Sequence, residues 1–320
     1  MEARLPQGVY CLANDKVIEW TIAFCESLRA HEPALPLVVI PFDDHVDRLS
    51  RLAERYRFAI LRDPSLERLD RIGTLFYPGD PTARHMFRKL AAFWGPFDRF
   101  IFLDSNIVVL GTLGSILSAG IGYDLVRFDT DIKPVYKSGP FRDEMVRAHG
   151  ARGFNAGAFI SRRGALTLDR VEGLAVDALA VKDHFMPAGD QPFLNYCFDM
   201  SGLRMEALSD LIPAMASCVW AAQAPVRRVR GAYRVLDKTR PVSTARSVPL
   251  LHWAGYRCNR HIPNRTIYLR YRLRAYGTTL ERLIYVWRFF ESQRFFDVRR
   301  ALPGLWRYLS RRLSTSARKE

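Results

Sequence analysis

One stretch of this chain constrains its fold more than any other: the segment from Phe97 to Leu110, FDRFIFLDSNIVVL. Apolar runs flank Asp104-Ser105-Asn106, so a buried strand ends on a carboxylate with an amide two residues later. Open α/β sheets bind ligands at the carboxyl ends of their strands, and hard divalent cations prefer oxygen ligands from protein and phosphate. The pattern is typical of a metal–nucleotide diphosphate site. Taken alone, a polar turn between two strands is the commoner explanation for so short an acidic pattern.

Short β-type runs alternate with amphipathic segments along the chain. The pattern predicts strands at 8–12, 37–40, 58–61, before Asp104, and at 124–128, 157–161 and 248–251. It predicts helices from about residue 17 to 29, at 45–57, from Asp80-Pro81 to Gly95-Pro96, and at 192–200. Such alternation favours an α/β fold with a mostly parallel sheet covered by helices on both faces. The stretch 221–248, rich in Arg, Pro and Ser, is interpreted as a loop.

Length and composition fit one large domain with an appendage. Of the 320 residues, 48% are hydrophobic and 12% aromatic, which is enough for a packed core and excludes global disorder. The five cysteines are scattered and form no CxxC pair, so neither a zinc site nor a disulfide framework is supported, and a cytoplasmic location is expected. The first residues lack the pattern of a secretory signal, and no stretch of about 18 uncharged apolar residues is present to span a membrane.

Positive charge is concentrated near the carboxyl end. From Arg257 onward, sixteen Arg and Lys side chains stand against four acidic ones, a net +12, whereas the preceding residues carry only +3 of the total +15. We therefore expect a near-neutral globular body at 1–262 and a basic, helical tail at 263–320.

Two apolar stripes at helical spacing run along this tail. The first comprises Leu280, Leu283, Ile284, Trp287 and Phe290, and the second comprises Leu305, Trp306, Leu309 and Leu313. A basic amphipathic helix with Trp and Phe commonly lies in a membrane interface, which predicts a peripheral protein at the inner membrane face. The alternative, given equal weight, is that the stripes pack back on the body with Arg outward.

Five sequence blocks follow one another along the body. They are CLANDKVIEWTIAFCESLR near the start, FRKLAAFWGPFDRFIFLDSNIVVL, FNAGAFISRRG at 154–164, GDQPFLNY at 189–196 and LHWAG at 251–255. In this order they resemble the family 8 glycosyltransferases, the glycogenin-like and bacterial galactosyltransferase-like enzymes of GT-A fold. The resemblance covers roughly residues 8 to 256. It implies sugar transfer from a nucleotide diphosphate sugar, UDP-linked by family habit, to a glycan or lipid-linked acceptor, with retention of configuration.

The resemblance also implies which residues bind the donor. It places Leu12, Ala13, Asn14 and Asp15 at the nucleotide base, Lys89 near the diphosphate, Ser105 at the strand end, Asn155 and Gly157 beside the sugar, and Gly255 and Arg257 near the phosphates. Two of these residues have a simpler structural explanation. Asp15 suits a helix N-cap, and Lys89 could be a solvated helix charge beside Arg84 and Arg88.

A metal site is implied at the end of the same strand. Asp104 and Asn106 correspond to the family's acidic metal-binding pair, and His252 corresponds to its third ligand. Imidazole suits Mn²⁺, whereas Mg²⁺ prefers oxygen ligands. Asn106 departs from the family pattern, since an amide replaces the second carboxylate and its lower charge weakens cation binding. A single His after an apolar strand is otherwise more often a core residue.

Asp190 and Gln191 are the implied catalytic residues, because they would flank the anomeric carbon and stabilise an oxocarbenium-like centre. The structural alternative for Asp190 is an N-cap of the following helix. A sugar-phosphate nucleotidyltransferase would need a Gly- and Arg-rich loop after the first strand, which CLANDKV does not provide. The main alternative is a nucleotide-sugar-binding protein with weak or no turnover, motivated by Asn106. Nucleic-acid binding rests only on charge and the segment YLRYRLRAY, so it ranks last.

Overall fold

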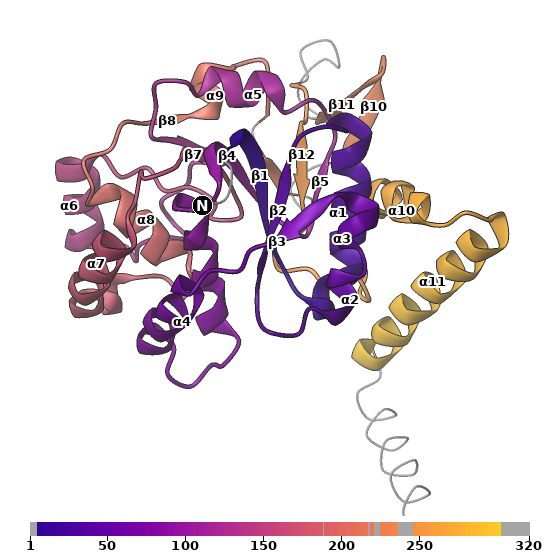
Figure 1. Cartoon of the computed structure of the whole chain (residues 1–320), viewed down its shortest axis with the longest axis horizontal. Helices are drawn as coiled ribbons and strands as arrows, with labels where there is room; N and C mark the ends of the chain where they lie inside the picture. The colour runs from indigo at the N-terminus through magenta and orange to yellow at the C-terminus, as the bar shows by residue number, and fades with distance from the viewer. Residues whose placement is uncertain (1–4, 188, 217, 221–224, 236–245, 302–320) are drawn as a thin grey trace, which may run out of the picture.

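A seven-stranded sheet forms the centre of the molecule, in the order β3-β2-β1-β4-β7-β6-β8. The computed structural model describes residues 5–187, 189–216, 218–220, 225–235 and 246–301 (Figure 1). The strands are β1 (Leu5–Ala13), β2 (Leu37–Pro41), β3 (Phe58–Ile60), β4 (Phe97–Asp104), β6 (Leu125–Arg127), β7 (Ala158–Arg162) and β8 (Met205–Ala207). Only the pairings of β7 with β4 and β6 are antiparallel, so the expected mostly parallel sheet is confirmed.

Strand register brings several chain segments to one edge of this sheet. β1 lies between β2 and β4, with Ala13 opposite Pro41 and Leu12 opposite Asp104. The carboxyl ends of these three strands therefore coincide. β7 runs the other way, and Gly157, just before it, accepts a hydrogen bond from the Asp104 backbone N–H at 2.8 Å. Residues 155–157 thus reach the same edge as the end of β4.

Helices cover both faces of the sheet because alternate strand residues point to opposite sides. Tyr10 and Leu12 belong to a core shared with α4 (Ser65–Phe76), the 3₁₀ helix η2 (Ala83–Phe93), α6 (Pro140–His149), α7 (Leu168–Ala180) and α8 (Gln191–Asp199). Val9 and Cys11 belong to the opposite core, with α1 (Ile18–His31), α2 (Asp47–Ser50), α3 (Ala53–Tyr56), α5 (Gly114–Ala119) and α9 (Leu208–Leu211). Short 3₁₀ turns η1 (Asp15–Val17) and η3 (Lys182–His184) complete the body.

A small second sheet carries His252 to the end of β4. It has the order β5-β12-β9, from β5 (Ile107–Val109), β12 (Leu250–His252) and β9 (Cys218–Trp220). β12 runs antiparallel to β5, with His252 opposite Ile107. Because β5 begins three residues after Asp104, this pairing places His252 next to the β4 end. The expected late strand therefore forms, but it lies outside the main sheet.

The chain after β12 returns to the body before it leaves it. α10 (Arg265–Arg272) packs on α1, where the fully buried ring of Tyr268 meets Trp20 edge-on at a centroid distance of 4.8 Å. Arg272 Nε also donates to Glu19 Oε2 at 2.8 Å. The expected division at residue 262 thus falls just before α10, a helix that shares the core of the body. The 3₁₀ helix η5 (Leu273–Ala275) directly follows α10.

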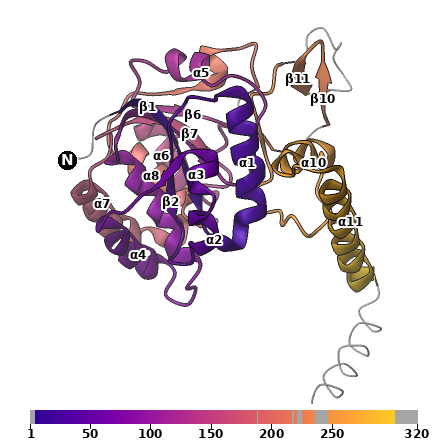
Figure 2. The ribbon, with the colours of Figure 1, turned by 45° about the vertical axis from the view of Figure 1, so that its right-hand side comes forward.

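α11 (Thr279–Ala301) reaches away from the body in both Figure 1 and Figure 2. One side of it packs inward through Tyr285 and Phe289, whose rings lie against neighbouring aromatic side chains. The other side exposes Leu280, Leu283, Ile284 and Trp287, each between 42% and 66% accessible. The stripe expected to pack or to meet a membrane is therefore open along these four residues. No helix in the described ranges is long and apolar enough to cross a membrane.

Three local expectations need correction or fall outside the description. The single helix expected at 45–57 is two short helices, α2 and α3, and Arg57 ends the second in a left-handed conformation. The segment expected as a loop contains a β-hairpin, β10 (Val226–Val229) and β11 (Ala232–Val235). The second apolar stripe of the tail lies beyond the described residues.

Candidate functional site

A cleft of about 310 Å³ opens where β1 and β4 end, at the lower limit of volumes typical for small-molecule sites. Eight residues expected at the site line it: Leu12, Ala13, Asn14, Lys89, Asp104, Ser105, Asn106 and Asp190. They come from the first strand, the 3₁₀ helix η2, the β4–β5 turn and the start of α8. The fold thus brings together residues that are up to about 180 positions apart in the sequence.

Lys89 organises the charges at the base of the cleft. Its ammonium lies 2.9 Å from Asp190 Oδ2 and 3.7 Å from Asp104 Oδ1, and it donates to the Ala156 carbonyl at 3.1 Å. Lys89 is only 4% exposed and Asp190 8%. Lys89 is therefore a buried residue and not the solvated helix charge that was the alternative. With three acceptor oxygens around its ammonium, Lys89 positions the two carboxylates.

The pKa directions follow from burial and from this ion pair. Burial alone lowers the pKa of Lys89, but attraction to Asp104 and Asp190 outweighs it, so the net shift is upward and the ammonium stays charged. Burial raises the pKa of Asp190, and the neighbouring ammonium opposes this rise only in part. Asp190 occupies the N-cap position of α8, but its side chain makes no capping hydrogen bond. Its carboxylate is committed to Lys89 instead.

His252 stands on the other side of Asp104. Its Nε2 lies 3.8 Å from Asp104 Oδ2, and its Nδ1 lies 3.2 Å from the Asn155 amide nitrogen. Burial lowers the pKa of His252 to about 4, so the ring is neutral near pH 7. A Cβ added at Gly157 would lie 2.5 Å from Asp104 Oδ2 and 2.6 Å from His252 Cε1. Only glycine at this position lets the two side chains approach each other.

Asn106 ties the turn after β4 to the strand that carries His252. Its Nδ2 donates to the Trp253 carbonyl at 3.0 Å, and the Trp253 N–H donates to the Asn106 carbonyl at 3.0 Å. This arrangement explains an amide at this position, because an aspartate would set a carboxylate oxygen against that carbonyl. The remaining amide oxygen, Asn106 Oδ1, is buried and accepts no hydrogen bond from the described residues.

The side chains of Asp104, Asn106 and His252 fit a divalent cation on one condition. Asp104 and Asn106 both line the cleft, and Asn106 Oδ1 and His252 Nε2 are buried without a hydrogen-bond partner in the described part of the chain. For Nε2 to bind a cation, the imidazole proton must lie on Nδ1 and be donated to Asn155. The Asn155 amide must then turn its oxygen toward the ring and give up the hydrogen bond that this oxygen accepts from the Gly157 N–H at 2.8 Å. Among the described residues, no group of three or more His, Cys, Asp and Glu side chains is placed to hold a metal. The candidate metal-binding set therefore depends on the amide oxygen of Asn106.

The far end of the cleft is built around Asn14 and a residue that sequence reasoning missed. Asn14 Nδ2 donates to Asp43 Oδ2 at 2.9 Å, and Asp43 is buried just beyond β2.

Asp15, expected at the nucleotide base, does not line the cleft. Its carboxylate accepts the backbone N–H groups of Arg48 at 3.0 Å and Leu49 at 2.8 Å, so it caps α2 rather than its own helix.

The remaining expected residues lie around the cleft rather than in its lining. Gln191 Oε1 accepts the Ala156 N–H at 3.2 Å and so holds the loop before β7. Gly255, at φ +76, allows the turn after His252, and the exposed Arg257 follows that turn. The structure thus gives Gln191 and Gly255 clear local roles, whereas Arg257 lies at the surface.

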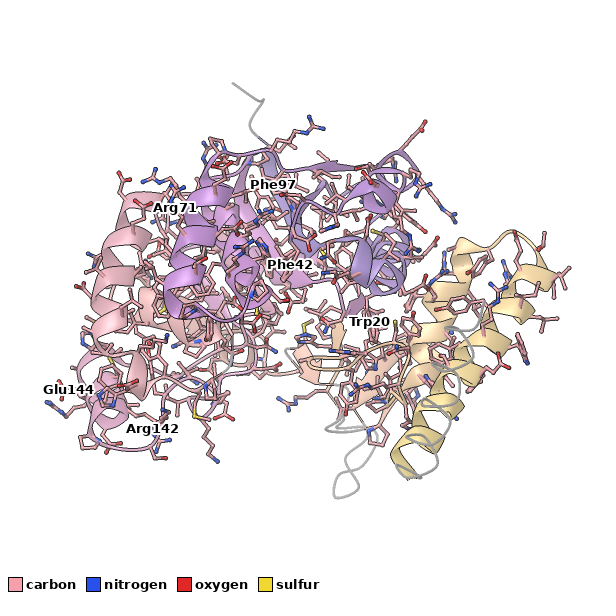
Figure 3. The ribbon with its side chains drawn as sticks, turned by 90° about the horizontal axis from the view of Figure 1, so that it is seen from below. Trp20, Phe42, Arg71, Phe97, Arg142 and Glu144 are labelled. Carbon is pink, nitrogen blue, oxygen red and sulfur yellow. The ribbon has the colours of Figure 1, made fainter. Side chains whose placement is uncertain are left out.

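Seven cleft residues were not predicted as site residues from the sequence. They are Lys16, Val17, Trp20, Phe42, Thr82, Met86 and Tyr256. Figure 3 labels two of the aromatic ones, Trp20 from α1 and Phe42 from the segment after β2. Trp20 fits the apolar face of its helix, so periodicity assigns it to the core. Phe42 could have been found, because it directly follows a strand parallel to the one that ends at Asn14.

Comparison with known proteins gives matches in structure only. No protein-family model matches the sequence, and no curated protein matches it. The apo structure of the bifunctional glycosyltransferase WbbM aligns with a TM-score of 0.55 at 13% identity, over 92% of this chain and 52% of that chain. This chain therefore spans about half the length of the WbbM structure.

The galactosyltransferase LgtC, solved in complex with donor and acceptor sugar analogues, aligns with a TM-score of 0.54 at 16% identity. That alignment covers 85% of this chain and 97% of LgtC. An active-site mutant of LgtC aligns with a TM-score of 0.51 at 17% identity, over 78% of this chain and 88% of that one. At such identities the likeness establishes the fold, which is the GT-A fold of these proteins.

Proposed function

We propose that this chain, which has the fold of the solved glycosyltransferases WbbM and LgtC, transfers a sugar from a nucleotide diphosphate sugar to a glycan or lipid-linked acceptor. The observation that carries the proposal is the ion pair of Lys89 with Asp190 beside Asp104 at the floor of the cleft. Buried charged groups that gather at a cleft are candidates for a functional site. A UDP-sugar is the donor class that we propose.

We propose one orientation of the donor in the cleft. Asn14 follows β1 and Phe42 follows β2, and both would contact the nucleoside, because an amide can hydrogen-bond a base edge and an aromatic ring can stack on it. Asp104, at the end of β4, and Asp190, at the start of α8, would face the diphosphate and sugar. Asp190 would stabilise positive charge at the anomeric carbon, and Lys89 would hold its carboxylate in place. We propose transfer with retention of configuration.

Asp104, Asn106 and His252 are the residues that would hold a divalent cation, with Mn²⁺ suiting the mixed oxygen and nitrogen set better than Mg²⁺. A bound cation would supply compensation for negative charge on the leaving diphosphate. The residues of the chain contribute in other ways. Gly157 keeps space for the Asp104 and His252 side chains, and Asn106 fixes the turn that carries Asp104 against the strand of His252.

The direct test is hydrolysis of a panel of nucleotide sugars with and without Mn²⁺, together with calorimetry of UDP binding. We expect Asp104→Ala to abolish both turnover and the effect of Mn²⁺ on UDP binding. Asp98→Ala is the matched control, because Asp98 is an exposed residue near the opposite end of the same strand. Absence of any nucleotide sugar turnover and of any Mn²⁺ effect would contradict the proposal.

A nucleotide-sugar-binding protein without turnover is the second candidate, favoured by the amide at Asn106. The same panel separates the two functions. Tight binding of a nucleotide sugar with no hydrolysis and no transfer to any glycan or lipid-linked acceptor would favour the binding protein.

We further propose that α11 holds the protein reversibly at an anionic membrane face, where such an acceptor would lie. The exposed residues Leu280, Leu283 and Trp287 form an apolar stripe on α11. The part of the sequence from Arg257 onward, which includes α11, has a net charge of +12. Each basic side chain near an anionic surface contributes about 1 kcal/mol of attraction, so a few suffice for attachment. Burial of the stripe in the lipid interface would add hydrophobic free energy.

Sedimentation with anionic vesicles tests this attachment. We expect Leu283→Glu/Trp287→Glu to lose vesicle binding while circular dichroism and donor hydrolysis stay unchanged. Val176→Glu, an exposed apolar residue on α7, is the control and should bind like the unaltered protein. Equal binding by the double variant would refute the role of α11.

A further inference from the structure

We infer that a second, smaller pocket at the carboxyl end of α1 binds a phosphate monoester group. The pocket has a volume of about 180 Å³ and is lined by residues from five elements, α1, β10, β11, α10 and η5. Arg228 comes from β10, Arg270 from α10 and Arg274 from η5, while His31, Tyr233 and Tyr271 supply further polar groups. Figure 2 shows α10 beside α1, with the β10–β11 hairpin next to it.

The location separates this pocket from the donor cleft. The cleft is lined by Val17 and Trp20 at the start of α1, and the pocket by Ala30 and His31 at its end. His31 follows Trp20 by eleven positions, which is about 16 Å along a helix axis. A ligand in the pocket would therefore be distinct from the nucleotide sugar.

The charge around the pocket is strongly positive. Among the described residues, the Arg270 side chain makes no hydrogen bond or ion pair, and the Arg228 side chain donates to the Gly231 carbonyl alone, at 3.2 Å. Arg274 has one acidic neighbour, Glu26, with its Nε 3.8 Å from Oε2. That carboxylate is shared, since Arg55 also lies 3.3 Å from Glu26. No acidic residue is among the residues that line the pocket.

The arginines are not needed to satisfy the end of α1. Helix carboxyl termini carry about half a negative charge, which cations can offset. Arg29 already serves this region, because it lies in the last turn of α1 and its guanidinium donates to the carbonyl of the C-cap residue Glu32 at 3.4 Å. Three additional guanidinium groups exceed what a half charge requires. A bound anion accounts for their convergence.

The neighbouring polar groups fit a phosphate more closely than a bare chloride ion. Tyr271 and His31 are joined by a 3.0 Å hydrogen bond. Burial lowers the pKa of His31, and Arg274 lowers it further, so this ring stays neutral near pH 7 and is able to donate a hydrogen bond. Guanidinium forks match the oxygens of phosphate in pairs. The volume, below the 300 Å³ or more typical of whole drug-sized ligands, suits a phosphate group with a short attachment.

Calorimetry on the full chain in low-salt, phosphate-free buffer tests the inference with two probes. Inorganic phosphate represents a free or sugar-linked phosphate, and short-chain phosphatidic acid below its micelle concentration represents a lipid headgroup. Arg270→Ala/Arg274→Ala removes two charges from the pocket. Arg51→Ala/Arg71→Ala removes two exposed charges elsewhere on the body and serves as the matched control.

We expect the pocket variant to weaken binding by about tenfold or more, because each lost contact is a charge-assisted hydrogen bond, while the control stays within about twofold, as expected for screened, distant charges. Stronger binding of the lipid probe would identify a lipid headgroup as the ligand source, and equal binding a soluble phosphate. Arg228→Ala, on the hairpin, should give the same loss. Failure of the unaltered protein to bind either probe, or equal binding by the pocket variant, would overturn the inference. Neither result depends on whether the donor cleft turns over a nucleotide sugar.

Discussion

Replacing Lys89 by Met should destabilise this protein more than any other single change at the cleft. Met has a similar length and no charge, so the substitution leaves the buried volume largely intact. It removes the ammonium that lies 2.9 Å from Asp190 and 3.7 Å from Asp104. Two carboxylates would then share the floor of the cleft without a counter-charge.

The size of the effect follows from these distances. With an effective dielectric constant of about 20, the attraction is roughly 6 kcal/mol across the shorter contact and 4 kcal/mol across the longer one. Much of this attraction offsets the cost of burying the charges. Removal of one partner of a buried ion pair typically costs about 3–5 kcal/mol, which we expect as the loss in the free energy of unfolding.

The loss should shrink on acidification. Burial already raises the pKa of Asp190, and the ammonium opposes that rise, so Lys89→Met should raise the pKa further. A carboxyl group with a raised pKa in the folded state destabilises the protein above that pKa. The penalty disappears as the pH falls toward the unfolded value of about 4, because both states are then protonated.

Urea unfolding between pH 4 and 8 measures both effects for Lys89→Met, Asp190→Asn and the double variant. We expect Asp190→Asn to cost less, because Lys89 keeps Asp104 as a partner, and the double variant to be more stable than Lys89→Met. If Lys89→Met costs less than about 1 kcal/mol at pH 7, the value of an exposed ion pair, the account of a buried charge network is refuted.

Four further predictions concern the site and the tail. Asp190→Asn should leave donor affinity within a few-fold while turnover falls by about two orders of magnitude, because the variant loses an interaction made in the transition state. Unchanged turnover would show that Asp190 has no catalytic role. Asn106→Asp should lose about 1 kcal/mol of stability without metal, yet show a larger rise in Tm with Mn²⁺ than the unaltered protein. Gly157→Ala should reduce turnover by forcing Asp104 and His252 apart, whereas Gly173→Ala, in open space on α7, should not. Truncation after Ile262 should lower Tm and solubility, because it removes buried Tyr268, and truncation after Gly277 should be milder.

The strand ends were predictable from sequence because each signal is local. Apolar runs that stop at Asn14 and at Asp104 mark two carboxyl ends, and parallel pairing places such ends together. The β10–β11 hairpin was missed for an equally local reason. Its turn is Arg230-Gly231, with φ of +49 and +86, and arginine is not among the residues usual at the first position of such a turn.

The roles of the charged residues depended on contacts that sequence spacing does not encode. Lys89 shares its helix with Arg88, and both are buried, yet Arg88 pairs with Asp70 at 2.6 Å while Lys89 faces the cleft. Asp190 looks like a helix cap until Lys89 is placed beside it. Asp15 looks like a cap of the next helix, but it caps α2, more than thirty residues away. Each case was decided by a partner distant in the sequence.

The amide at Asn106 makes sense in the charge balance of the cleft. Asp104 and Asp190 carry two formal negative charges, Lys89 carries one positive charge, and His252 is neutral near pH 7. The floor therefore has a net charge of −1 before any ligand enters. A third acidic residue, at position 106, would double this net charge next to the Trp253 carbonyl, which the amide instead engages with a hydrogen bond. The amide thus favours stability of the empty cleft at the expense of cation affinity, because a neutral oxygen attracts a divalent ion less than a carboxylate does. If the proposed function holds, a cation should bind together with the donor diphosphate, whose own oxygens would restore the missing charge.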